Sequence, residues 1–156
     1  MSDDARILVL CLGNDLRRDD GVGWRVAEQL EEAPPAGATV RRSAVSGFYL
    51  IDELIEFDRV VVVDAVRTGT HAPGDVFAFP VEALDGPPGP SPHAVGLPTV
   101  LQVGRQCGLT LPRVIHVVAI EVDDMDTLGA GLTPAVEAAL PRAEALVRAL
   151  AARSTA

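Results

Sequence analysis

The chain has 156 residues, of which 48% are hydrophobic and 4% aromatic, and its formal net charge is -9. This length suffices for one well-buried core, so we expect a single domain over residues 1–156, and the negative charge disfavours nucleic acid or an anionic membrane as a partner. No run approaches the roughly 20 apolar residues of a membrane span, and the N-terminus MSDDAR lacks the features of a signal peptide, so a cytoplasmic protein is expected.

Short apolar runs alternate with helical patterns along the chain, beginning with a strand. Clusters of β-branched and apolar residues predict strands at 6–12, 39–43, 59–64, 75–79 and 113–121. Apolar residues at helical spacing predict helices at 21–32, 47–56, 93–107 and 133–152. This β-α-β alternation predicts an α/β fold, a three-layer α/β/α sandwich around a twisted, mainly parallel sheet of about five strands. The proline-rich and glycine-rich segment 84–92 is expected to be irregular.

The loop after the first strand carries an acidic pair. Its sequence GNDLRRDDGVG places Asp19 and Asp20 between the strand and the first helix. Ligands of open α/β sheets bind beyond the carboxyl ends of the strands, so these carboxylates stand where a site is expected. A dinucleotide site is disfavoured, because Val26 occupies the place of the third glycine and two acids would repel a pyrophosphate. The loop therefore predicts a cation site or a hydrolytic site.

Two further residues stand at comparable junctions. Asp64 ends the apolar run of the third strand, and His93 precedes the third helix. Each has an ordinary structural explanation by itself, as an acceptor for backbone amides or as a solvated ring. Together with Asp20 they can converge over one end of the sheet, where a mixed carboxylate and imidazole set suits nickel or zinc. Three protein ligands would leave coordination positions open for water or substrate, as in catalytic metal sites.

Three motifs, in this order, resemble the hydrogenase maturation protease family. GNDLRRDDGVG, VVVVDAV and SPHAVGLPTVL match its pattern G-N-x-L-x-x-D-[DE]-x-x-G, then D-A, then S-x-H-x-x-G-L, and GLTPAVEAAL resembles the start of its final helix. The resemblance covers essentially the whole chain and implies a monomer with a phosphorylase/hydrolase-like sheet between helix layers. One segment departs from the pattern: a glycine-rich D-G-G-T-like stretch, associated with substrate recognition, is replaced by RSAVSG, which retains Gly47.

The resemblance implies an endopeptidase that removes a C-terminal extension from the precursor of a nickel-iron hydrogenase large subunit. The resemblance also implies that this enzyme acts after nickel insertion, with the nickel in the precursor as the recognition signal. The positions that match the nickel-binding residues are Asp20, Asp64 and His93. Candidate substrate-binding residues are Gly13 and Asn14, together with Gly47, although an asparagine in a turn usually bonds the backbone of its own loop.

The residues leave the catalytic chemistry open. No serine or cysteine stands in a nucleophile elbow, and Cys11 lies within a strand, where it is expected to fill the core. A divalent ion would polarise the scissile carbonyl while Asp20 or Asp64 takes the proton of a water; a pair of carboxylates sharing a proton is the alternative. Asp19 is expected to be a loop or capping residue. The ion belongs either to the resting protein or to the substrate.

Two other functions share parts of this pattern. A phosphoacceptor receiver domain also has an acidic pair after the first strand and an aspartate after the third, but it carries a lysine after the fifth strand, and all 13 basic residues here are arginine. A metal-dependent hydrolase of small amides or peptides would use the same site without a protein partner. The acidic run from Glu121 to Asp126 is expected to be a solvated face.

Overall fold

The structure, a computed structural model, describes residues 5–84, 96–129 and 131–153. Five strands form one sheet in the order β2-β1-β3-β5-β4. They are β1 (Ile7–Leu12), β2 (Ala38–Ser43), β3 (Arg59–Val66), β4 (Val76–Pro80) and β5 (Val114–Glu121). Neighbouring strands run parallel except at the edge, where β4 is antiparallel to β5. The predicted α/β fold with a mainly parallel sheet is therefore confirmed.

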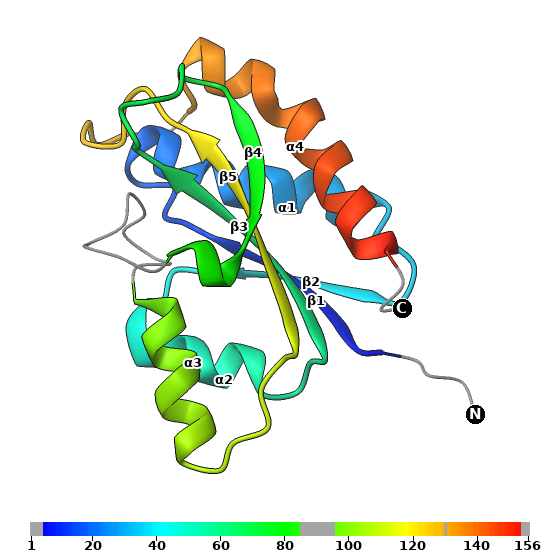
Figure 1. The fold of residues 1–156 in the computed structure, drawn as a ribbon. Coiled ribbons are helices and arrows are strands. Elements are labelled where there is room, and N and C mark those ends of the chain that lie inside the picture. The colour runs from blue at the N-terminus through cyan, green and yellow to red at the C-terminus, as the bar shows by residue number, and fades with distance from the viewer. Residues whose placement is uncertain (1–4, 85–95, 130, 154–156) are drawn as a thin grey trace.

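Helices cover both faces of this sheet (Figure 1). The α-helices are α1 (Val22–Glu32), α2 (Leu50–Leu54), α3 (Leu97–Gln106) and α4 (Pro134–Ala152), and the 3-10 helices are η1 (Arg18–Gly21), η2 (Gly47–Tyr49) and η3 (Val81–Leu84). Helices α1 and α4 pack on one face, and α2 and α3 pack on the other. No helix within the described ranges is long and apolar enough to cross a membrane.

Two sequence predictions differ from the observed helices. The helix expected at 47–56 is divided into η2 and the short α2, and α2 ends at Leu54. At its start, Gly47 takes a φ of +62° that a regular helix does not contain. The helix expected from residue 93 is described only from Leu97, since residues 85–95 lie outside the described part of the chain. For the same reason, most of the irregular segment predicted at 84–92 stays a prediction.

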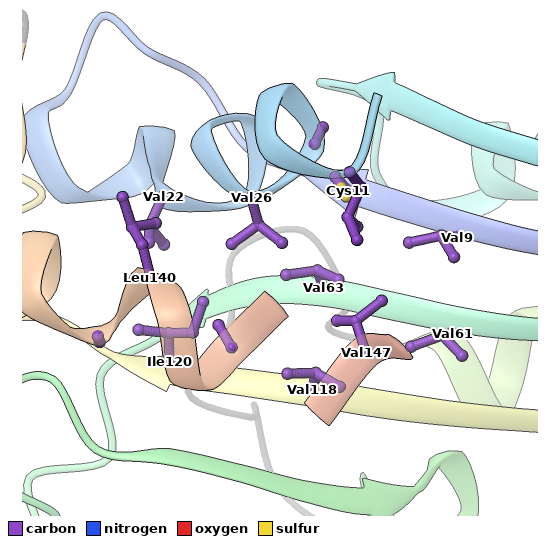
Figure 2. Close-up of a cluster of buried hydrophobic side chains, with 14 of the residues drawn as sticks. Val9, Cys11, Val22, Val26, Val61, Val63, Val118, Ile120, Leu140 and Val147 are labelled. Atoms are coloured by element: carbon purple, nitrogen blue, oxygen red, sulfur yellow. The ribbon is translucent and has the colours of Figure 1, made fainter. Parts of the chain in front are cut away.

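The central strand β3 is buried along its whole length. Val61 and Val63 face the cluster under α1 and α4, and Val60 and Val62 face the cluster under α2 and α3. Figure 2 shows the first cluster, in which Leu140 and other side chains of α4 meet valines of the sheet. Full burial of one such aliphatic side chain contributes about 1.5–3 kcal/mol, so both layers hold the sheet in place.

The strand order does not fit the receiver hypothesis. Receiver-type doubly wound sheets follow the order 2-1-3-4-5. Here β5 lies between β3 and β4, and Ala119 pairs with Phe77 in antiparallel register. The fourth strand is thus an antiparallel edge strand, and the carboxyl ends of β1, β3 and β5 are left adjacent.

Truncation of the core leucine on α4 should destabilise the fold. Leu140 is 3% exposed, so Leu140→Ala should lower the free energy of unfolding by about 2–5 kcal/mol through lost burial and a residual cavity. Leu16→Ala is the matched control, because its side chain is 66% exposed and its loss should change stability by no more than about 0.5 kcal/mol. Urea unfolding followed by circular dichroism measures both. Equal losses would contradict the assignment of Leu140 to the core.

Candidate active site

Helix α1 begins directly against the carboxyl ends of two strands. A Cβ atom on Gly23 would lie 2.3 Å from the Leu12 carbonyl oxygen and 3.2 Å from the Val63 carbonyl oxygen. Glycine therefore permits a backbone approach that any side chain would prevent. Asp64 follows Val63 in β3, Asp20 precedes Gly23 by one turn in η1, and η1 packs against β3. The structure thus brings Asp20 and Asp64 to the same end of the sheet, where the carboxyl ends of β1 and β3 lie. This end is called the carboxyl edge below.

Both carboxylates at this edge are buried. Asp64 is 0% exposed and Asp20 is 5% exposed. Buried carboxylates are costly and are retained where they bind a donor, a cation or a substrate. The two therefore meet the requirement for a site that binds a cation or moves a proton away from bulk water.

His93, the third predicted metal ligand, lies outside the described residues. Among the residues that are described, no group of three His, Cys, Asp or Glu side chains could hold a metal ion. Asp20 and Asp64 supply oxygen donors that suit a divalent ion, and an imidazole would complete a mixed set. The three-ligand site consequently stays a prediction.

The predicted substrate-binding residues Gly13 and Asn14 shape the loop around Asp20. A Cβ on Gly13 would lie 2.3 Å from the Asp20 carbonyl oxygen, so the loop closes only over a glycine. The Asn14 N–H donates to that same oxygen at 3.2 Å, and the Asn14 side-chain oxygen accepts from the Leu16 N–H at 2.9 Å. Both residues have this structural role, and contact with substrate stays a prediction.

Gly47, the third residue of that set, opens η2 beyond the end of β2. Its φ of +62° favours glycine, and a Cβ there would meet no heavy atom within 4 Å. The position faces open space, so it leaves room for a partner. Substrate contact at Gly47 also stays a prediction.

Asp19 is the acceptor for a set of four hydrogen bonds. Its carboxylate accepts from the Thr133 N–H and the Thr133 hydroxyl, both at 2.7 Å, and from the N–H groups of Asp123 and Asp124 at 3.0 and 2.8 Å. The side chain is 0% exposed. These bonds join η1 to the segment between β5 and α4, shown side by side in Figure 1. Asp19 is therefore a structural loop residue, as predicted.

Glu121 was wrongly assigned to a solvated face. It is 2% exposed at the end of β5, and its carboxylate accepts from the Thr68 N–H at 2.8 and 3.1 Å and from the Thr68 hydroxyl. It ties the loop after β3 to β5, next to the edge that carries Asp64. The signal was its position at the last residue of a buried strand, but the acids that follow obscured it. Asp64, in contrast, lies two residues before the end of β3, which continues past the predicted end at residue 64 to Val66.

Comparison with known proteins assigns the chain to a protein family. The family model for hydrogenase maturation proteases matches residues 24–149, most of its length. The chain belongs to the hydrogenase maturation protease family. It is 31% identical over 150 residues to the hydrogenase 2 maturation protease of Escherichia coli strain K12, an alignment that covers 93% of this chain and 90% of that protein.

Solved structures of the family share this fold. The hydrogenase maturating endopeptidase HybD from E. coli aligns with a TM-score of 0.78 and 29% identity, covering 93% of this chain and 91% of that one. The [NiFe] hydrogenase maturation protease HybD from Thermococcus kodakarensis aligns with a TM-score of 0.72 and 28% identity, covering 94% and 99%. The predictions of a hydrolase and of a hydrogenase maturation endopeptidase are therefore confirmed.

In this maturation protease, neither cysteine is placed as a nucleophile. Cys11 is 0% exposed beneath α1, as predicted, and burial raises the pKa of its thiol to about 12. A thiol with this pKa stays protonated at neutral pH, and the thiolate is the reactive form. Cys107 is exposed at the end of α3, away from the carboxyl ends of the strands. The site chemistry therefore does not use a thiolate.

A thiol reagent should distinguish the two cysteines. In the folded protein at about pH 8 we expect only Cys107 to react, because the Cys11 thiol is buried and its pKa is raised. Both should react after unfolding in guanidinium, and native Cys107→Ser should be unreactive. Intact-mass spectrometry counts the modified thiols, and rapid modification of Cys11 in the folded state would contradict its burial.

Proposed function

We propose that this protein removes a C-terminal extension from the precursor of a nickel-iron hydrogenase large subunit after nickel has been inserted, acting as a monomer. The observation that carries the proposal is the pair of buried carboxylates, Asp20 and Asp64, at one sheet edge of a hydrogenase maturation protease. The related protein from T. kodakarensis is described as a [NiFe] hydrogenase maturation protease. Its similarity over 94% of this chain supports the same substrate class.

Nickel is part of the substrate in this proposal. Asp20, Asp64 and His93 bind the nickel of the loaded precursor, and their oxygen and nitrogen donors suit that ion. Three ligands from the protease leave positions for ligands that the precursor retains. A precursor without nickel lacks this contact, and cleavage is then restricted to the loaded form.

The two carboxylates also supply the proton transfer that peptide hydrolysis needs. A water adds to the scissile carbonyl, one carboxylate accepts its proton, and that proton passes to the leaving amine as the C–N bond breaks. The bound nickel increases the electrophilicity of a nearby carbonyl. We assign the proton transfer to Asp20 or Asp64, because both are buried at the edge where the precursor's nickel would bind.

Exposed leucines beside the site favour a protein substrate over a small amide. Leu16 is 66% exposed and Leu128 is 76% exposed. Their segments are joined by a parallel bridge between Arg17 and Gly129 and by a hydrogen bond from the Gly129 N–H to the Leu16 carbonyl at 3.0 Å. The register sets Leu16 beside Leu128, a few residues from Asp20. A small amide is too small to cover both leucines, whereas a folded precursor protein can bury them on binding.

Replacement of either carboxylate should slow processing strongly without unfolding the protein. Asp20→Asn and Asp64→Asn should each lower kcat for the nickel-loaded precursor by about 10²–10⁴-fold, because proton transfer and nickel binding are lost. Intact-mass spectrometry of the precursor measures loss of the C-terminal peptide. Asp52→Asn, at an exposed position on α2, is the matched control and should cleave like the wild type.

Nickel-free precursor tests the recognition step with the same assay. It should stay intact under conditions in which the wild-type protein processes the loaded form. Equal cleavage of both forms would refute nickel as the signal. No cleavage of an authentic loaded precursor would favour the hydrolase of small amides or peptides.

Substitution of the exposed leucines should weaken precursor binding. Leu16→Ser and Leu128→Ser should each raise KM for the precursor by roughly 5- to 30-fold, as expected when about 1–2 kcal/mol of apolar contact is lost. kcat should change little. Leu109→Ser is the matched control, since Leu109 is 41% exposed and precedes β5, at the opposite edge of the sheet. An unchanged KM in both site variants would argue against docking on this surface.

A further inference from the structure

Thr133 stands at the N-terminus of α4, but its hydroxyl does not cap that helix. With a φ of -67° and a ψ of 156° it is the N-cap residue, and no side-chain hydrogen bond to the helix is made. An N-cap threonine ordinarily accepts a hydrogen bond from a backbone N–H of the first turn. Here the hydroxyl donates to Asp19 Oδ2 at 2.7 Å, while the Thr133 N–H donates to Asp19 Oδ1 at 2.7 Å. The first turn of α4 is thus fastened to η1 by one buried carboxylate.

The backbone that this carboxylate holds is strained. Arg18 has a φ of +37°, an uncommon value for a residue with a side chain. Such a conformation persists where surrounding contacts fix it. The Arg18 N–H donates to the Gly129 carbonyl at 3.1 Å, and the Asp19 N–H donates to the Asp124 carbonyl at 2.9 Å. These bonds and those to the Asp19 side chain hold the strained turn immediately before Asp20.

We propose that Thr133 is a positioning residue for Asp20, acting through the carboxylate of Asp19. Thr133 is 5% exposed, and its hydroxyl is one of two donors that it contributes to the hydrogen bonds around Asp19. Without it, Asp19 keeps its backbone donors but loses a charge-assisted bond, and the strained turn at Arg18 can relax. Asp20 then moves relative to Asp64, because Asp64 is fixed separately within β3 by its pairing with Ala119.

This inference rests on the proposed function only for its kinetic consequence. A reacting group displaced by about 1 Å loses up to ~10²-fold in rate even when the fold is retained. Because the displacement falls on a group that takes part in the reaction, the larger effect should be on kcat, with a smaller effect on KM. The turn itself should loosen whether or not a substrate is present.

Three variants test the role of the hydroxyl. Thr133→Val removes the hydroxyl and keeps the shape, and kcat for nickel-loaded precursor should fall roughly 10- to 100-fold with a smaller change in KM. Thr133→Ser restores the hydroxyl and should recover most of the rate. Val147→Ala, a buried position farther along α4, is the control for a loosened helix and should keep the wild-type kcat.

Amide hydrogen exchange gives a second readout that needs no substrate. The Asp20 N–H donates to the Arg17 carbonyl at 2.9 Å, and the Asn14 N–H donates to the Asp20 carbonyl at 3.2 Å. Both amides should exchange at least about tenfold faster in Thr133→Val and at wild-type rates in Thr133→Ser and Val147→Ala.

The two readouts separate the two proposals. Faster exchange without cleavage by the wild-type protein would support the positioning role of Thr133 and refute the proposed function. Wild-type cleavage with unchanged kcat in Thr133→Val, or unchanged exchange at both amides, would overturn the positioning role. An equal fall of kcat in Val147→Ala would also overturn it, because the effect would then follow general loosening of α4.

Discussion

The hydrogen bonds to the buried carboxylate of Asp19 join two segments that are more than 100 residues apart in the chain. Four donors from Asp123, Asp124 and Thr133 converge on it, so η1 and the start of α4 form one unit at the carboxyl edge of the sheet. Hydrogen bonds to a charged acceptor contribute more than neutral ones. Their loss would leave the buried carboxylate of Asp19 with too few hydrogen-bond donors, which is costly. The geometry of Asp20 depends on this unit.

The edge itself is produced by the packing of α1. Because Gly23 lets the helix contact the carbonyl groups of Leu12 and Val63, η1 is drawn toward the end of β3. β3 is buried along its whole length, so Asp64 enters the site from a central strand that is packed on both faces. Asp20, in contrast, lies in η1, whose position is fixed by hydrogen bonds to the segment between β5 and α4. Such a site combines one carboxylate on a packed strand with one on a loop that tertiary hydrogen bonds position.

The sequence predicted most of the elements, for reasons that are local. β-branched runs such as VVVV and the helical spacing on α4 gave the strands and helices within a few residues. The antiparallel direction of β4 could not be predicted, because an alternating apolar pattern is the same whether the strand runs parallel or antiparallel to its neighbour. The burial of Glu121 was also missed, because its partner Thr68 is 53 residues away. The positions of Asp20 and Asp64 at junctions of strands and loops predicted that they converge at one end of the sheet, and the structure places η1 against β3 there. Their roles as ligands or catalytic groups stay predictions.

The sequence by itself determined the fold class, the family and the candidate carboxylates, because these depend on residue type and spacing along the chain. The tertiary structure decided which residues support the site. Asp19 and Asp20 are adjacent and chemically identical, yet the carboxylate of Asp19 binds the donors of a distant loop, whereas Asp20 lies where η1 packs against β3. That difference depends on which backbone N–H groups reach each side chain in the folded protein. Such contacts arise only when α1, α4 and the sheet pack together.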